Sequence, residues 1–311
     1  MEILLQLGLL VLGFVMLMKG ADWFVEGASK IADKFGIPQL VIGLTIVAMG
    51  TSLPEAAVSI SAALKGSAGI TIGNVVGSNI MNVLVILGLT SVICAISVQN
   101  STIRYEIPFV ILVSVVLAAM GLTDNRINRL EGIILWVFMV VYLLYLLRMA
   151  KNNPQEEDEN DAKKESVIKM IFFVLIGAVL VVKGSDVAVD AATALATIFG
   201  MDERLIGLTI VAFGTSLPEL VTSATAAVKG KADIAVGNIV GSNIFNILFV
   251  VGTTALITPV EYSANFMVDS IVMICAVILL LACVVRKKSL GRTGGAVMLL
   301  AYAGYFIYLL R

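Results

Sequence analysis

The stretch VAMGTSLPE at residues 47–55 occurs a second time as VAFGTSLPE at residues 211–219. The similarity around it keeps one register, offset by 164 residues, from Lys19/Lys183 to Val83/Ile247. Of the 65 paired positions in this span, 36 are identical, which is far more than chance allows. The chain therefore contains an internal duplication, as many transporter folds do.

Each copy places a carboxylate, Glu55 or Glu219, inside strongly apolar sequence. A charged side chain at the centre of a bilayer costs about 2.5 to 3.5 kcal/mol even on the most lenient insertion scale. Helix packing in membranes does not require such a charge, because small residues are sufficient for close contact. The two glutamates are therefore predicted to be ion or substrate ligands.

The composition is that of a polytopic membrane protein, with 59% hydrophobic and 14% charged residues and a mean hydropathy of +1.02. Apolar stretches of about 20 residues, the length that spans a bilayer, predict an all-α fold with five helices in each half. The ten predicted helices are residues 3–29, 38–64, 69–95, 105–122, 130–149, 167–195, 203–228, 233–258, 265–285 and 293–310. The predicted units are a first five-helix repeat at 1–150, a cytoplasmic linker at 151–166 and a second five-helix repeat at 167–311.

An odd number of helices per repeat makes the second repeat enter the membrane from the opposite side, so we expect inverted topology. Lys and Arg gather in alternate loops, and basic loops favour the cytoplasm. Both termini are therefore predicted to lie on the extracellular side and the central linker in the cytoplasm. We expect the membrane to be a prokaryotic plasma membrane. The repeat mates Lys65 and Lys229 then fall on opposite sides. The N-terminal segment is expected to be the first helix and not a cleavable signal peptide.

Other classes of protein are disfavoured by the residues available. The chain has no histidine, which excludes His-based zinc sites and Ser-His-Asp or Cys-His nucleophile systems. Cys94, Cys275 and Cys283 lie in apolar helices and are expected to pack as small hydrophobes. The acidic linker lacks the spacing and turn glycine of a calcium loop. We therefore expect neither an enzyme nor a cofactor, and the predicted partners are ions and the lipid bilayer, not nucleic acid.

Several oxygen atoms are predicted to gather near each glutamate. Helical spacing puts Thr51 and Ser52 on the face of Glu55, although a hydroxyl beside a proline can also serve only to repair the backbone. Pro54 cannot donate a backbone hydrogen bond, so carbonyls around Ala48 and Gly50 are expected to lose their usual partners. The second half repeats this arrangement.

The following helix adds a hydroxyl and an amide on one face, Ser78 and Asn82 in the first half and Ser242 and Asn246 in the second. All these ligands are hard oxygen donors, which suit calcium, magnesium or alkali ions. A calcium ion uses about 6 to 8 oxygens, so the two halves together offer a surplus. Such a surplus can hold several monovalent ions in overlapping positions.

Further repeated polar residues are interpreted as structural. Asn79 and Asn243 sit one residue off the ligand face, so we expect an interhelical or capping role, and Asn74 and Asn238 receive the same interpretation. Lys19 with Asp22, and their mates Lys183 with Asp186, are spaced as i, i+3 ion pairs within one helix.

The paired GTSLPE and GSNxxN signatures resemble the two alpha repeats of the calcium/cation antiporter superfamily, in its sodium/calcium exchanger branch. The resemblance implies a ten-helix inverted-repeat fold with a midplane site from helices two, three, seven and eight. It also implies sliding of helices one and six, and exchange of sodium for calcium as transported ions. The ligands it implies are Ala48, Thr51, Ser52, Glu55, Ser78, Asn82, Ala212, Thr215, Ser216, Glu219, Ser242 and Asn246.

Alternatives remain open at this level, and one is an antiporter of the same fold that carries another divalent cation or uses another coupling ion. Potassium-dependent relatives typically carry Asp where Asn246 stands, and proton-coupled ones favour GNxxE over GTSLPE, so both coupling ions are disfavoured. The same polar helices could form a cation channel, which would need a continuous wetted path. An intramembrane enzyme lacks a nucleophile and base pair. A monomer would be sufficient, because one chain supplies both halves of the site, and no large calcium-sensing domain is expected.

Overall fold

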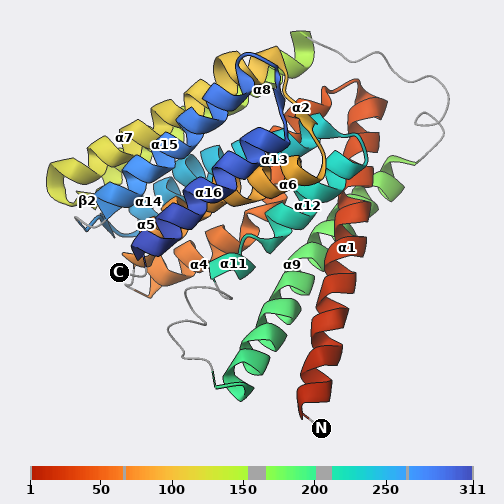
Figure 1. The fold of residues 1–311 in the computed structure, drawn as a ribbon. Helices are drawn as coiled ribbons and strands as arrows, with labels where there is room; N and C mark the ends of the chain where they lie inside the picture. Colours follow the sequence, from red (N-terminus) through yellow and green to blue (C-terminus); the bar gives the residue numbers. More distant parts are fainter. Residues whose placement is uncertain (1, 66–67, 153–165, 201–211, 264–265, 310–311) are drawn as a thin grey trace.

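The computed structural model describes residues 2–65, 68–152, 166–200, 212–263 and 266–309, and it is almost entirely helical (Figure 1). Labels with η mark π-helical segments, which have one extra residue per turn. The first half comprises α1 (Glu2–Phe35), α2 (Gln39–Ile42), η1 (Gly43–Val47), α3 (Ala48–Thr51), α4 (Leu53–Leu64), α5 (Ile70–Met81), η2 (Asn82–Leu87), α6 (Gly88–Ile93), β1 (Ile96–Ser97), η3 (Thr102–Glu106), α7 (Ile107–Asp124), β2 (Arg126–Ile127) and α8 (Arg129–Asn152). The second half comprises α9 (Val167–Ile198), α11 (Ala212–Gly214), α12 (Leu217–Val228), α13 (Ala232–Phe245), η5 (Asn246–Val251), α14 (Gly252–Ile257), β3 (Val260–Glu261), α15 (Phe266–Val284), β4 (Ser289–Leu290) and α16 (Arg292–Leu309).

The helices confirm the prediction of an all-α membrane protein. Within the described residues, seven helices are long and apolar enough to cross a bilayer, or eight if the bent pair Gln39–Thr51 and Leu53–Leu64 forms one span. Helix is found in the described part of every predicted range, but the predicted count of ten spans exceeds this number and remains a prediction. Much of the predicted helix at 203–228 and of the linker at 151–166 lies outside the described residues.

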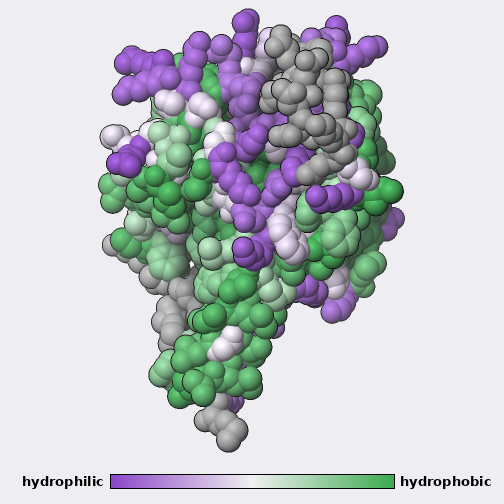
Figure 2. Space-filling model, turned by 90° about the vertical axis from the view of Figure 1, so that its right-hand side faces the viewer, coloured by the Kyte–Doolittle hydropathy of each residue, from purple (hydrophilic) through white to green (hydrophobic). Residues whose placement is uncertain are grey.

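The two longest helices, α1 and α9, lie side by side along much of their length (Figure 1). Glycines permit this contact, because a Cβ at Gly177 would lie 2.5 Å from the backbone nitrogen of Phe24, and one at Gly20 would lie 2.8 Å from that of Val181. Figure 2 shows hydrophobic side chains over the projecting end of this pair and hydrophilic ones gathered at the opposite end of the molecule. Such exposed apolar surface is typical of a lipid-facing region.

The helices α5 and α13, with their continuations to Ile93 and Ile257, are the most deeply buried. A Cβ at Gly241 would lie 2.8 Å from the Cα and carbonyl oxygen of Leu44, so α13 packs backbone to backbone against η1. Helices α7, α8 and α15 carry many exposed apolar residues and lie outside this centre. The fold therefore has a polar motif at its centre and apolar helices around it.

Two short antiparallel strand pairs join the halves. β1 pairs with β4, with Ile96 opposite Leu290, and β2 pairs with β3, with Ile127 opposite Val260. Ile96 and Val260 are repeat mates, 164 residues apart. The two strand pairs are therefore equivalent, because each pairs a strand of one half with a strand of the other half at repeat-equivalent positions.

Carboxylate–tyrosine hydrogen bonds tie the outer helices together in both halves. The Tyr145 hydroxyl of α8 donates to Glu106 of η3, and the Tyr305 hydroxyl of α16 donates to Asp269 of α15 at 2.9 Å. Glu106 is as buried as Glu55, at 1% exposure. Its other oxygen, Oε2, is buried without a hydrogen-bond partner, so Glu106 is a third deeply buried carboxylate, located among the outer helices.

One predicted ion pair is present and the other is wrong. Lys183 and Asp186 pair within α9 at 3.1 Å, as expected. Asp22 instead pairs with Lys229 at 2.8 Å, because α1 packs along α12 and brings the end of that helix onto Asp22. The cysteines are free, and Cys275 is exposed on α15, so the expected packing is wrong for that residue.

Candidate ion-binding site

The two glutamates lie at matching helix breaks. Glu55 and Glu219 are in the first turns of α4 and α12 and are 1% and 0% exposed. Each helix begins after a serine with a non-helical backbone, Ser52 at φ −84°, ψ 9° and Ser216 at φ −92°, ψ 2°, and has proline in its first turn. The break bends the helix axis by 49° in the first half. The repeated sequence thus produces the same local geometry twice.

The carbonyl prediction at Ala48 needs a correction. Its oxygen keeps the backbone hydrogen bond from Ser52 N–H, at 3.1 Å, because Pro54 removes only the donor that would have reached Gly50. The Ala48 carbonyl also accepts from the Ser242 hydroxyl at 3.3 Å. It therefore faces the second half but is not a freed carbonyl.

Hydrogen bonds between the halves bring the predicted ligands together. The Ser52 hydroxyl donates to Glu219 Oε1 at 3.0 Å, and the Thr51 hydroxyl lies 2.9 Å from Asn238 Oδ1. Within the first half, the Ser78 hydroxyl lies 3.5 Å from Glu55 Oε1. Groups that are far apart in the sequence thus form one buried polar centre.

Four asparagines connect α5 and α13. Asn79 Nδ2 donates to the Asn243 carbonyl at 3.1 Å, and Asn243 Nδ2 donates to the Asn79 carbonyl at 3.3 Å. Asn82 Nδ2 donates to Asn243 Oδ1 at 3.0 Å, and Asn246 Nδ2 donates to Asn79 Oδ1 at 3.1 Å. The predicted interhelical role of Asn79 and Asn243 is confirmed. We call these four residues the amide quartet.

The amide quartet orients the two predicted ligands within it. Because the NH₂ groups of Asn82 and Asn246 are used between the helices, their Oδ1 atoms are left without donors, although both residues are buried. Each is also the first residue of a π-helical segment, η2 or η5. Such segments often occur at functional sites.

The carboxylates also have unsatisfied oxygens. Glu55 Oε2, Glu219 Oε2 and the Ser216 hydroxyl are buried without a hydrogen-bond partner. No Lys or Arg within the described ranges pairs with either glutamate. A buried carboxylate without a counter-charge is costly, and a bound cation would supply that charge and would coordinate the unpartnered oxygens. The donor set therefore fits a hard cation.

Some predicted residues have no described contact with the others. Thr215 is half-buried, and no hydrogen bond to it is described. The side chain of Ala212 lies outside the described part of the chain. The described residues contain no group of three or more His, Cys, Asp or Glu side chains that could hold a metal ion.

Two supporting serines were not singled out from the sequence. Asn74 Nδ2 donates to the Ser59 hydroxyl and Asn238 Nδ2 donates to the Ser223 hydroxyl, both at 2.9 Å. These bonds confirm an interhelical role for the two asparagines, between α4 and α5 and between α12 and α13. The signal was present, because Ser59 and Ser223 are identical at repeat-equivalent positions.

The fold and site define a multi-pass helical membrane protein with a buried polar centre lined by oxygen atoms. The sequence profile described as "Sodium/calcium exchanger protein" matches residues 5–148 and 169–311. The chain belongs to this family of cation antiporters, whose members are transporters and not enzymes.

Individual relatives agree over the full length. The chain is 39% identical to the putative antiporter CaxA of Alkalimonas amylolytica, over 95% of both chains. It is 38% identical to the inner membrane protein YrbG of Escherichia coli (strain K12), over 96% of both. Among solved structures, the sodium-calcium exchanger NCX_Mj superposes with a TM-score of 0.85 at 33% identity, covering 99% of this chain and 100% of that one.

Proposed function

We propose that the protein is a sodium-driven calcium antiporter that works by alternating access at the buried site. The observation that carries this proposal is the pair of buried glutamates, one from each half, each with an unpartnered oxygen. Two carboxylates match the charge of one calcium ion. More than two sodium ions bound there would leave excess positive charge, so exchange would respond to the membrane potential.

The ligands proposed for the transported ions are those of the two repeated motifs. The unpartnered oxygens of Glu55, Asn82, Ser216, Glu219 and Asn246 support five of them directly. The hydrogen bonds of Thr51, Ser52, Ser78 and Ser242 within the same centre support four more. The remaining proposed ligands are Thr215 and the carbonyls of Ala48 and Ala212.

The proposed architecture is two inverted five-helix repeats, at residues 1–150 and 167–311, joined by a cytoplasmic linker at 151–166. β1 pairs with β4, and its repeat mate β3 pairs with β2. These equivalent pairings support two repeats that are related by internal symmetry. In this arrangement both termini and Lys65 lie on the extracellular side of the membrane. Lys229 lies on the cytoplasmic side.

A carrier fits the burial of the site better than a channel does. Ser52, Glu55, Asn82, Glu219 and Asn246 are at most 1% exposed. A conducting pore needs a continuous wetted path through such groups, whereas a carrier encloses its ions. The burial therefore favours an occluding antiporter.

Equilibrium binding to the purified protein tests whether sodium and calcium share the site. We expect sodium to displace bound radioactive calcium with a steep concentration dependence, because several sodium ions replace one calcium. Potassium at equal ionic strength should displace little, since Asn246 supplies an amide and not a third carboxylate. Calcium binding that is insensitive to sodium would contradict a shared site.

A further inference from the structure

A cavity of about 390 Å³ opens between the start of α7, with the preceding η3, and the C-terminal part of α8. Its volume is within the range of ligand pockets. Large aromatic side chains fill the space between the two helices. The rings of Phe109 and Tyr142 stack at 5.5 Å, and those of Tyr105 and Tyr145 lie 6.3 Å apart. Leu112, an exposed apolar residue, extends the wall of the cavity along α7, so the cavity faces the region of the lipid.

Two buried oxygen atoms at this cavity have no hydrogen-bond partner. They are Glu106 Oε2 and the Tyr142 hydroxyl, in residues that are 1% and 4% exposed. The other carboxylate oxygen, Oε1, accepts from the Tyr145 hydroxyl. A carboxylate in apolar surroundings is costly without a counter-charge. A ligand that has a positive charge and N–H donors would satisfy both atoms.

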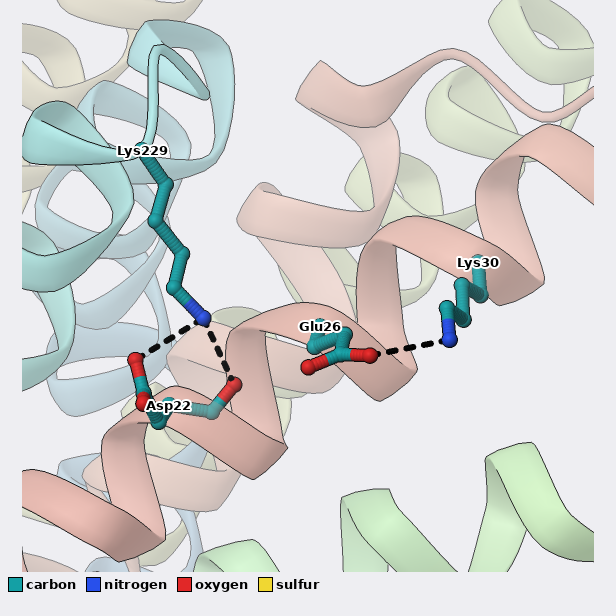
Figure 3. A network of polar contacts seen from close by, with 4 residues as sticks. All are labelled: Asp22, Glu26, Lys30 and Lys229. Carbon is teal, nitrogen blue, oxygen red and sulfur yellow. Dashed lines mark hydrogen bonds and ion pairs between the residues drawn. The ribbon is translucent and has the colours of Figure 1, made fainter.

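A positive side chain, Arg104, borders the same cavity. Elsewhere in the described chain, Lys229 pairs with Asp22 at 2.8 Å (Figure 3). Arg104 has no such carboxylate partner among the described residues, and its guanidinium lies 5.8 Å from the centre of the Tyr105 ring. A guanidinium group binds phosphate through paired hydrogen bonds. The cavity therefore offers one place for a cation and another for a phosphate.

Both charged residues lie near the level of the lipid headgroups. The apolar span that contains them begins at Thr102, and four residues of helix rise at most about 6 Å. The headgroup region on each side of a bilayer is about 5 to 8 Å thick. Glu106 is therefore near the boundary between headgroups and acyl chains, and the apolar wall of the cavity continues beyond it along α7.

We propose that this cavity binds a phospholipid whose headgroup carries a primary amine, as in phosphatidylethanolamine. The ammonium group donates to Glu106 Oε2 and to the Tyr142 hydroxyl. The phosphate binds Arg104, and an acyl chain packs on Phe109 and Leu112.

The unpartnered oxygens select the amine. The aromatic rings would attract a choline headgroup as well, because cation–π attraction needs only the positive charge. Choline has no N–H group, however, so it would leave Glu106 Oε2 and the Tyr142 hydroxyl without donors. A glycerol headgroup carries no cation and would leave the carboxylate without a counter-charge. Of the three headgroups, only ethanolamine supplies both the charge and the donors.

The charged groups of this cavity belong to the first half alone. At the positions 164 residues later, Val268 stands in place of Arg104 and Ser270 in place of Glu106. The ion-site motif, in contrast, is present in both halves. The helices η3, α7 and α8 contribute none of the proposed ion ligands, so lipid binding and ion transport are separable and either can fail alone.

Native mass spectrometry of the delipidated protein in detergent measures the preference. Phosphatidylethanolamine and phosphatidylcholine with the same acyl chains are added in equal amounts, and the ratio of the two bound forms is determined. We expect the ethanolamine lipid to be favoured about ten-fold, since hydrogen bonds to charged groups contribute a gain of this size. N-methylation then removes the donors one at a time. The monomethyl lipid keeps two N–H groups for the two oxygens and should retain the preference, whereas the dimethyl lipid keeps one and should lose part of it.

Variants assign the preference to individual groups. Glu106→Gln removes the charge and keeps the shape, so the two lipids should bind about equally. Tyr142→Phe should reduce the preference about two- to five-fold, and Arg104→Gln should weaken both lipids alike without changing their ratio. Asp269→Asn is the matched control, because it breaks the carboxylate–tyrosine bond to Tyr305 in the second half and should keep the parent ratio. Gel filtration and thermal unfolding establish that each variant is folded.

Equal binding of the ethanolamine and choline lipids by the parent protein would overturn the proposal. A preference that Glu106→Gln leaves intact would also overturn it. So would tighter binding of phosphatidylglycerol, because Arg104 alone would then hold an anionic headgroup. The methylation series uses the unaltered protein, so its result decides the question even if a variant does not fold.

Discussion

Glu55→Gln and Glu219→Gln are each expected to reduce sodium-dependent calcium uptake to the level of protein-free vesicles. The amide keeps the shape of the side chain and removes the charge that offsets the lost hydration of calcium. Changes in groups that only orient a metal ligand cost about 10- to 100-fold in affinity, so losing a charged ligand should cost at least that much. Initial uptake rates in proteoliposomes measure the effect.

The stability of these variants should move in the opposite direction. A buried carboxylate without a positive counter-charge destabilises a fold, so either substitution should leave the ion-free unfolding temperature unchanged or raise it. Glu106→Gln is the matched control, because Glu106 is equally buried but bonded to Tyr145 outside the site. It should retain uptake. Wild-type exchange in both site variants would remove the glutamates from the mechanism.

Gly241→Ala is expected to destabilise the protein. The new Cβ at position 241 would lie 2.8 Å from the backbone of Leu44 and from the Ala48 side chain, so α13 must move away from η1. Overpacking of this kind costs about 1 to 3 kcal/mol.

Thermal unfolding in detergent and calcium uptake are measured for the Gly241→Ala variant. Gly241→Ala should unfold at a lower temperature than the parent and also lose uptake, because displacement of α13 separates Ser242 from the Ala48 carbonyl. An unfolding temperature and an uptake rate equal to those of the parent would contradict the close packing of α13 on η1.

The apolar stretches predict the all-α fold, and the duplication shows which polar residues within them are repeated. A carboxylate inside apolar sequence is costly, and helix packing does not require one at Glu55 or Glu219. This cost is why the sequence predicts that the two glutamates are ligands. The π-helical turns that begin at Asn82 and Asn246 left no such signal, since their residues also suit an ordinary helix.

Contacts between the halves could not be predicted from the sequence, because the same repeated residues can form ion pairs and hydrogen bonds with several different partners. Asp22 and Asp186 have the same i, i−3 lysine, yet Asp22 takes Lys229, which only tertiary packing brings near. The amide quartet likewise depends on how α5 and α13 cross. The prediction that the Ala48 carbonyl loses its backbone partner is wrong. Proline at position 54 removes the donor to Gly50 and not the donor to Ala48.

The most direct test of the central claim is uptake of radioactive calcium into proteoliposomes that contain the purified protein. One set of vesicles is loaded with sodium and a matched set with potassium, at equal pH and osmolarity, and both are diluted into sodium-free medium. An antiporter of the proposed kind takes up calcium only into the sodium-loaded vesicles, and uptake stops when the gradient is collapsed. Equal calcium entry into both sets would indicate a channel and contradict the account.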